Sequence, residues 1–338
     1  MTSRPGKKKM TIVDIAEASG VSVTTVSRIL NNKPDVAEET RQRVLQVMAD
    51  RGFAPQSAWQ QIRSGKSRSI VLHFPQVFNL LAHRIIIAAA LECEQAGYSI
   101  NILVNPLSDS DLLATFRSGQ ADGMILLEIL THDARIATLR RHDYPFVMIG
   151  RGSDNAGLSF VDVEIEHGIQ LAMQHLIDFG HRVIGFVTVS PRVEDEGYGY
   201  GTWALHSYQQ ACVGHGLEPI WCAGGAEAGV HAMLDAHPNL TAIITPHENC
   251  VISVLQAVRA RGLRIPEDLS VIGLLTESMG ELATPPMTTI GFPSDELGRE
   301  AARILLGRLD GSLAGPQQLL IRPELNVRGS TGPARDHV

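Results

Sequence analysis

The sequence predicts an α/β protein with two parts: a small N-terminal helix-turn-helix domain and a larger two-lobed body built on parallel sheets. One observation is a change of charge, since residues 1–68 carry a net charge of +6 and the remainder carries −13. Helical periodicity interrupted by a glycine marks the first part, and short apolar runs alternating with helical patterns mark the second. At 338 residues and 44% hydrophobic, the chain has room for two or three domains.

The basic part predicts three short helices. Residues 11–19 place apolar side chains at helical intervals, with Thr11 as the N-cap, and Gly20 ends this helix. A second helix begins at Val21-Ser22, and an amphipathic stretch over residues 37–48 completes a small core. Two helices joined by a glycine turn are the arrangement of a helix-turn-helix domain.

The second helix presents hydroxyl and guanidinium groups that suit the major groove of DNA. Arg28 can form a bidentate pair with guanine, hydroxyls can reach phosphates or base edges, and the methyls of Val23 can touch a thymine methyl. The alternative is an ordinary solvated face of a small helical domain. The candidate DNA-binding residues here are Thr11, Ser22, Val23, Thr24, Thr25, Ser27, Arg28 and Asn31.

These residues also carry a resemblance to a known family. The runs Thr-Ile-Val-Asp-Ile-Ala at 11–16 and Gly-Val-Ser-Val-Thr-Thr-Val-Ser-Arg-Ile-Leu-Asn at 20–31 are similar to the LacI/GalR family of bacterial transcriptional regulators. The resemblance implies that residues 53–56 lead into a hinge helix that folds on operator DNA. Ile62 stands where the family has a leucine that wedges into the minor groove, and Trp59 stands where it has a small alanine.

The acidic part predicts two lobes with parallel sheets. Alternation of strands and helices implies parallel sheets covered by helices, and its extent implies two lobes. Ligands in such folds bind beyond the carboxyl ends of the strands, which places a ligand in the cleft between the lobes. The predicted strands are 70–74, 98–104, 122–127, 146–149, 183–189, 242–245 and 269–274.

The resemblance extends over this body, through stretches such as 175–182 and 261–273, and implies a fold similar to periplasmic sugar-binding proteins. The boundaries that we expect are a helix-turn-helix domain at 1–55, a hinge helix and linker at 56–67, an N-terminal lobe at 68–157 and 288–318, a C-terminal lobe at 158–287 and 319–331, and a tail at 332–338.

Several positions that supply charged or amide groups to the family's effectors differ in this chain. Two aspartates are replaced by Gly150 and Leu275, an arginine by Ala204, and an Asn-Asp pair by His247-Glu248. Because sugars are held by such groups, their loss leaves sugar hydroxyls with fewer partners. The candidate effector-binding residues are Asn79, which is retained, and Arg151, Trp203, His247 and Glu248, which could replace the missing partners.

The sequence therefore predicts a DNA-binding transcriptional regulator, a repressor of carbohydrate catabolism genes that acts as a homodimer on pseudo-palindromic, double-stranded operator DNA. A small-molecule effector is expected in the cleft. Three hypotheses for it stay open: a sugar held by rearranged polar groups, a less polar or differently charged molecule such as a nucleobase, or no small inducer at all. Whether an effector would act as inducer or corepressor also stays open.

Other functional classes lack the residues that they need. The apolar runs are too short for a membrane helix, and no apolar export segment follows Lys7–Lys9, so a cytoplasmic protein is expected. The four cysteines lie far apart, and neither a metal site, a cofactor motif nor a catalytic motif is evident. We expect no enzyme. A stand-alone solute-binding protein, the distant alternative, would need an export signal and no helix-turn-helix.

Two further segments receive structural interpretations. The run Gly-Tyr-Gly-Tyr-Gly at 197–201 lacks the spacing of a nucleotide-binding loop and is predicted to be a mobile loop beside the cleft. His181 is expected to be a hydrogen-bonded structural residue.

Overall fold

The computed structural model describes residues 11–30, 36–51, 66–74, 80–188, 197–223 and 227–335. These form two compact units: the N-terminal residues up to Arg68 together with Ser118–Asp122, and the remaining body. The predicted DNA contacts Asn31 and Ile62, the predicted hinge segment, and the predicted effector contact Asn79 lie outside the described residues. Within the described ranges, no helix is long and apolar enough to cross a membrane.

The N-terminal unit contains the predicted helix-turn-helix. Its helices are α1 (Ile12–Ser19), α2 (Val23–Leu30) and α3 (Glu38–Asp50). Gly20, with φ at +66°, ends α1 in the left-handed conformation that glycine adopts without steric cost. All three helices contribute to one small core, formed by Ile15, Ala16, Val26, Ile29, Val44 and Met48.

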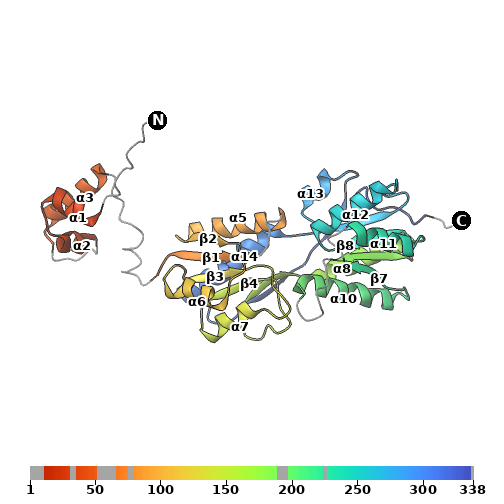
Figure 1. Cartoon of the computed structure of the whole chain (residues 1–338), viewed down its shortest axis with the longest axis horizontal. Helices are drawn as coiled ribbons and strands as arrows, with labels where there is room; N and C mark the ends of the chain where they lie inside the picture. Colours follow the sequence, from red (N-terminus) through yellow and green to blue (C-terminus); the bar gives the residue numbers. More distant parts are fainter. Residues whose placement is uncertain are drawn as a thin grey trace. The chain divides into compact units, whose positions relative to one another are not determined.

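The N-terminal lobe of the body is a six-stranded parallel sheet with helices on both faces. The strand order is β11-β5-β4-β3-β1-β2. Helices α5 and α14 cover one face, and α6 and α7 cover the other (Figure 1). The elements are β1 (Ser69–His73), α5 (Leu80–Gln95), β2 (Ser99–Leu103), α6 (Asp109–Arg117), β3 (Gly123–Leu126), α7 (Ala134–Arg141), β4 (Phe146–Ile149), β5 (Phe160–Val163), α14 (Ser294–Asp310) and β11 (Gln318–Ile321).

The C-terminal lobe repeats this architecture in the order β12-β10-β9-β8-β6-β7, with only β12 antiparallel to its neighbour. Helices α11 and α12 pack on one face, and α8 and α10 on the other. The elements are α8 (Ile165–Asp178), β6 (Ile184–Thr188), α10 (Gly199–Gly214), β7 (Ile220–Ala223), α11 (Glu227–Ala236), β8 (Ala242–Thr245), α12 (Glu248–Ala260), β9 (Ser270–Leu275), α13 (Glu277–Leu282), β10 (Thr288–Gly291) and β12 (Leu325–Asn326). Both lobes confirm the predicted fold class, and all seven predicted strands are present.

The chain crosses between the lobes three times, and the crossings are bonded to one another. The Glu164 amide donates to the Ile321 carbonyl oxygen at 2.9 Å, and the Arg322 guanidinium contacts the Glu164 carboxylate at 2.8 Å. The Gly291 amide donates to the Glu324 carbonyl oxygen at 2.8 Å. These bonds connect the three chain segments that cross between the lobes.

The crossings correct the expected lobe boundaries. Strand β5, which we expected in the C-terminal lobe, pairs with β4 and β11 in the N-terminal sheet. Strand β10, which we expected in the N-terminal lobe, pairs with β9 in the other sheet, and β11 completes the N-terminal sheet. The reason is that a strand belongs to the sheet in which its main-chain groups are bonded, which a short apolar run does not reveal.

The end of the chain also differs from the expected tail. The Gly332 amide donates to the Ser270 hydroxyl at 3.1 Å, and the Ala334 amide donates to the Phe179 carbonyl oxygen at 2.8 Å. The C-terminal lobe therefore includes residues beyond 331. His181 is buried between the Thr241 hydroxyl and the Gly332 carbonyl oxygen, at 2.8 and 3.0 Å, so its structural interpretation is confirmed.

Candidate DNA-binding helix and effector cleft

The predicted DNA-binding residues fall into two groups in the structure. Thr11 accepts a hydrogen bond from the Asp14 amide, and the Asp14 carboxylate accepts one from the Thr11 amide at 2.7 Å, which makes a capping box at the start of α1. The Ser22 hydroxyl accepts from the Thr25 amide at 3.0 Å and lies 2.9 Å from the Thr25 hydroxyl. These side chains fix the first turns of α1 and α2.

The second group faces outward from α2. Val23, Thr24 and Arg28 are exposed, and Ser27 is half-buried. Val26 and Ile29 on the same helix are buried in the small core. The helix therefore holds one apolar face against the domain and presents a methyl, hydroxyl and guanidinium face to its surroundings.

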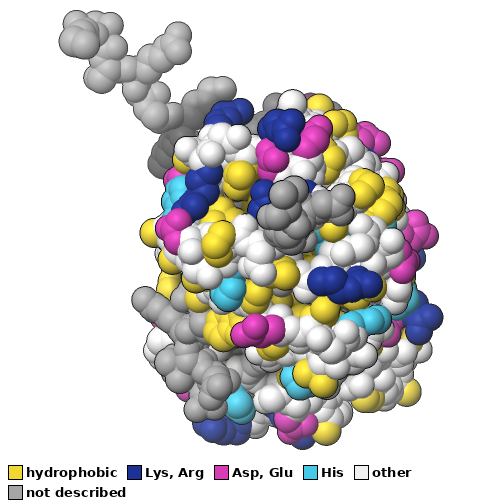
Figure 2. Space-filling model, turned by 90° about the vertical axis from the view of Figure 1, so that its right-hand side faces the viewer, with side chains coloured by type: hydrophobic (Ala, Val, Ile, Leu, Met, Phe, Trp, Pro, Cys, Tyr) yellow, Lys and Arg dark blue, Asp and Glu magenta, His cyan; other side chains and the backbone are white. Residues whose placement is uncertain are grey.

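Charge is distributed differently over the body. Figure 2 views the C-terminal lobe, where basic, acidic and histidine side chains are scattered among hydrophobic and uncharged ones. On this face the basic side chains are interspersed with acidic and uncharged ones (Figure 2). Together with the net charge of −13 on the remainder of the chain after residue 68, this favours the basic N-terminal part as the candidate contact for a polyanion.

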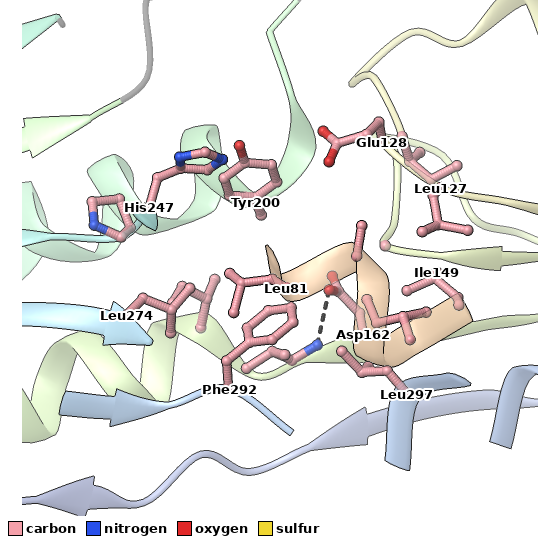
Figure 3. A pocket seen from close by; sticks show the side chains of 17 residues that line it. Leu81, Leu127, Glu128, Ile149, Asp162, Tyr200, His247, Leu274, Phe292 and Leu297 are labelled. Carbon is pink, nitrogen blue, oxygen red and sulfur yellow. Dashed lines mark hydrogen bonds between the residues drawn. The ribbon is translucent and has the colours of Figure 1, made fainter. Parts of the chain in front are cut away.

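A cavity of about 90 Å³ lies between the lobes, at the carboxyl ends of strands from both sheets. Most of its lining is apolar, and the polar groups are two carboxyls, a phenol and an imidazole (Figure 3). The lining residues are Leu81, Ala82, Ile85, Leu127, Glu128, Ile129, Ile149, Gly150, Asp162, Val163, Ile165, Tyr200, Pro246, His247, Leu274, Phe292 and Leu297.

Glu128 is the most unusual of these residues. It lies two residues after the end of β3, and its φ of +53° lies in the left-handed region that disfavours side chains. Burial raises the pKa of its carboxyl to about 7, with a further increase from Glu248 and an opposing effect from Arg135. At neutral pH this group is poised between its protonated and ionised forms.

Tyr200 and His247 form an aromatic side of the cavity. Their rings are nearly parallel, with centroids 5.7 Å apart. The Nδ1 atom of His247 accepts a hydrogen bond from the Asn249 amide at 3.1 Å and caps α12, which leaves the proton on Nε2. Burial lowers the pKa of His247 to about 4, so the imidazole is neutral at physiological pH.

Arg151 is engaged by carboxylates of both lobes. Its guanidinium contacts Asp162 of the N-terminal lobe at 3.1 Å and Glu166 of the C-terminal lobe at 2.6 Å. It also lies over the Trp203 ring, 5.6 Å from the centroid. Burial raises the pKa of Asp162, and the neighbouring guanidinium opposes that change. Arg151 and Trp203 thus lie beside the cavity and connect the two lobes.

Main-chain hydrogen bonds also join the lobes at one point, which we call the interlobe latch. The Thr131 amide donates to the Gly197 carbonyl oxygen at 2.9 Å, and the Gly199 amide donates to the Ile129 carbonyl oxygen at 3.0 Å. A Cβ atom on Gly199 would lie 2.3 Å from the Arg151 carbonyl oxygen. The prediction of a mobile loop at 197–201 is wrong, because these residues form the latch and the first turn of α10.

The structure sorts the predicted effector residues. His247 lines the cavity, and Glu248 is buried next to it in the first turn of α12. Arg151 and Trp203 are not part of the lining. Sequence analysis missed Glu128, Asp162 and Tyr200. The first two could have been noticed as carboxyls that interrupt apolar runs near strand ends.

A helix-turn-helix unit joined to a two-lobed body with an enclosed cleft defines a class of protein: a DNA-binding regulator whose body resembles periplasmic binding proteins. The family model for bacterial regulatory proteins of the lacI family matches residues 11–56, and that for a periplasmic binding protein-like domain matches residues 173–331. The chain belongs to the LacI family of transcriptional regulators. Like its curated relatives, it is a transcriptional regulator and not an enzyme.

Full-length relatives support this assignment. The transcriptional repressor CytR of Escherichia coli is 30% identical over 98% of this chain and 99% of its own length, and the transcriptional regulator DegA of Bacillus subtilis is 28% identical over 96% and 99%. Among solved structures, a complex of the regulator CelR with cellobiose aligns with a TM-score of 0.70 at 25% identity, covering 95% of this chain and all of that one. The lac repressor dimer bound to operator and an anti-inducer aligns with a TM-score of 0.81 at 22% identity, covering 96% and 100%.

Proposed function

We propose that this regulator represses transcription in the bacterial cytoplasm by binding a pseudo-palindromic operator as a homodimer, under the control of a small molecule in the interlobe cleft. The observation that carries the proposal is the face of α2, where Val23, Thr24 and Arg28 are exposed above a buried apolar face. Such a helix can enter the major groove, with Arg28 paired to guanine and Ser22 and Thr25 near the phosphates.

A dimer is supported by an apolar surface on the N-terminal lobe. Ile87 and Leu91 on α5, with Ile102 and Val104 at the edge strand β2, are each 46–55% exposed. The two elements lie next to each other (Figure 1), and β2 is the last strand of its sheet, so its outer main-chain groups face away from the sheet. A second copy of the chain would cover both the apolar side chains and this edge.

The cleft is the place for the effector. The regulator CelR of Thermobifida fusca is 27% identical to this chain over 96% of it, and a complex of a regulator CelR with cellobiose has a similar structure. Both findings support a carbohydrate-responsive regulator. The mostly apolar lining and the carboxylate-bound state of Arg151 favour a second candidate, an effector less polar than a disaccharide. In either case, closure of the lobes would change their arrangement across the dimer and hence the spacing of the two DNA-binding units.

Selection from a random double-stranded DNA library with the purified full-length chain tests this function. We expect a pseudo-palindrome to be enriched, and replacement of Arg28 by Ala to cost about 1–3 kcal/mol and relax the choice at one base pair of each half-site. Thr40→Ala, on α3 and not on α2, serves as the control. If no sequence is enriched, or if Arg28→Ala leaves the ratio of specific to scrambled binding unchanged, the assigned role of α2 is wrong.

A further inference from the structure

The cations near the cavity already have carboxylate partners. Arg151 is shared by Asp162 and Glu166, so one guanidinium faces two carboxylates. Arg135 binds Asp133 at 2.6 Å and also donates hydrogen bonds to main-chain carbonyl oxygens, including that of Glu128 at 2.8 Å. His247 is neutral. The described lining therefore contains no positive group for an anionic ligand.

The carboxylate of Glu128 forms no ion pair with Arg135 or Arg151. In the part of the chain that the structure describes, its carboxylate makes neither a hydrogen bond nor an ion pair, and Figure 3 shows it directed across the cavity toward Tyr200. Glu248 lies close enough that its charge opposes ionisation of Glu128. A ligand that brings positive charge would relieve both the desolvation and the mutual repulsion of these carboxyls.

The backbone at Glu128 adds independent support for a ligand-binding role. Its positive φ costs a residue with a side chain roughly 1–2 kcal/mol relative to glycine. Strained positions of this kind cluster at ligand-binding sites, where the surrounding structure holds them. Here the strain places a carboxyl group at the end of β3, facing the cavity.

We propose that the effector is a small organic cation, a protonated amine or quaternary ammonium group on a ring-shaped or apolar body, whose charge binds against Glu128. This inference rests on the proposed function and specifies the chemistry of its effector. The face of the Tyr200 ring can stabilise the same charge through a cation–π contact. Leu81, Ile85 and Phe292 line the apolar side of the cavity and would bury the body of the ligand.

The same arrangement selects against other ligands. A phosphate or carboxylate would face Glu128, and the described lining offers such an anion no positive group. A neutral polyol would offer hydroxyls to an apolar wall, where they lose water without gaining partners. An amine and an alcohol of the same size and shape should therefore differ in affinity because only the amine carries a positive charge.

The test compares probes that differ only in the charged group. Titration calorimetry on the full-length protein at pH 8 compares cyclohexylmethylamine, whose amine is protonated at that pH, with cyclohexylmethanol. We expect the amine to bind about 10-fold or more tightly than the alcohol. Glu128→Gln should abolish that preference, whereas Glu277→Gln, which removes an exposed carboxylate outside the cavity, should retain it.

A pH series on the wild-type protein gives a readout that does not depend on a variant. A cation binds the ionised form of Glu128, so its affinity should rise about 10-fold between pH 6 and pH 8 and its binding should release a proton below pH 7. The other charged or titratable groups near Glu128 are Arg135, Glu248 and Tyr200, and the cavity lining adds Asp162, whose pKa is also raised to about 7, and His247. Loss of the pH dependence in Glu128→Gln assigns it to Glu128.

The outcomes separate this inference from the proposed function. Equal binding of amine and alcohol, binding by neither, amine binding that survives Glu128→Gln, or an affinity that falls as pH rises each overturns the cationic effector. Operator selection by the same protein preparation, measured without any ligand, decides the regulator function independently. If a preparation selects an operator but shows any of these four results, the proposed regulator function stands and the proposed cationic effector is refuted.

Discussion

Replacing Gly199 with Ala should open the cleft. The new Cβ would lie 2.3 Å from the Arg151 carbonyl oxygen, well inside the roughly 3.0–3.4 Å at which such contacts begin. Neither atom can move away by a side-chain rotation, because the obstacle is main chain. The added methyl must therefore separate residues 197–199 from the N-terminal lobe.

The size of the effect follows from the bonds of the interlobe latch. Separation breaks the hydrogen bonds from Thr131 to Gly197 and from Gly199 to Ile129. At a net value of about 0.5–1.5 kcal/mol each, their loss shifts the equilibrium between closed and open lobes by about 1–3 kcal/mol, or roughly 5- to 150-fold. Helix propensity acts in the opposite direction, since alanine stabilises a helix by up to about 1 kcal/mol over glycine.

Native-state hydrogen exchange measures this shift without a ligand. Peptides covering the amides of Thr131 and Gly199 should exchange about 5- to 150-fold faster in Gly199→Ala. Gly214→Ala, at the other end of α10, is the matched control, because its Cβ would meet nothing within 4 Å. If both variants protect the latch amides as well as the wild type does, Gly199 does not hold the lobes together and the reasoning fails.

Three further predictions concern other parts of the chain. The folded protein holds the proton of Glu128 more tightly than the unfolded chain does, so the free energy of unfolding should fall by about 2–3 kcal/mol as pH rises from 4.5 to 7. Urea titrations of Glu128→Gln should lack that part of the fall. A pH profile identical to that of the wild type would contradict this prediction. Leu91→Asp should place a charge in the proposed dimer surface and yield monomers in sedimentation at low micromolar concentration, whereas the exposed Val213→Asp should not. Thr11→Ala should lower the stability of the DNA-binding unit by about 0.5–2 kcal/mol through loss of its capping box, and an unchanged thermal unfolding transition of that unit would refute this role.

Sequence patterns predicted the DNA-binding unit well because its structure is local. Helical periodicity and a glycine in a left-handed turn are properties of neighbouring residues, and Ile15, Val26 and Val44 meet as the pattern predicted. The two parallel sheets also followed from pattern. Assignment of strands to lobes did not, because an apolar run does not show which strand its main-chain groups will bond, and β5 pairs with β4 whereas β10 pairs with β9.

The cleft was predicted only in outline. His247 was identified because it departs from a family pattern, whereas Glu128 was hidden at the end of a strongly apolar run. Tyr200 lies in a glycine-rich segment whose composition predicts a loop. The first turn of α10, which contains Tyr200, is held by main-chain hydrogen bonds between Gly197 and Thr131 and between Gly199 and Ile129 of the opposite lobe. A local sequence pattern does not reveal such long-range bonds.

The bonds of the interlobe latch use main-chain atoms alone, and this separates closing from recognition. Side chains that line the cavity can be exchanged without removing a donor or acceptor of the interlobe latch, provided that residue 199 remains glycine. One closing device can therefore serve ligands of different chemistry. For protein engineering, the body is a scaffold in which ligand specificity can be redesigned through Glu128, Tyr200 and His247 while the conformational response to binding is kept.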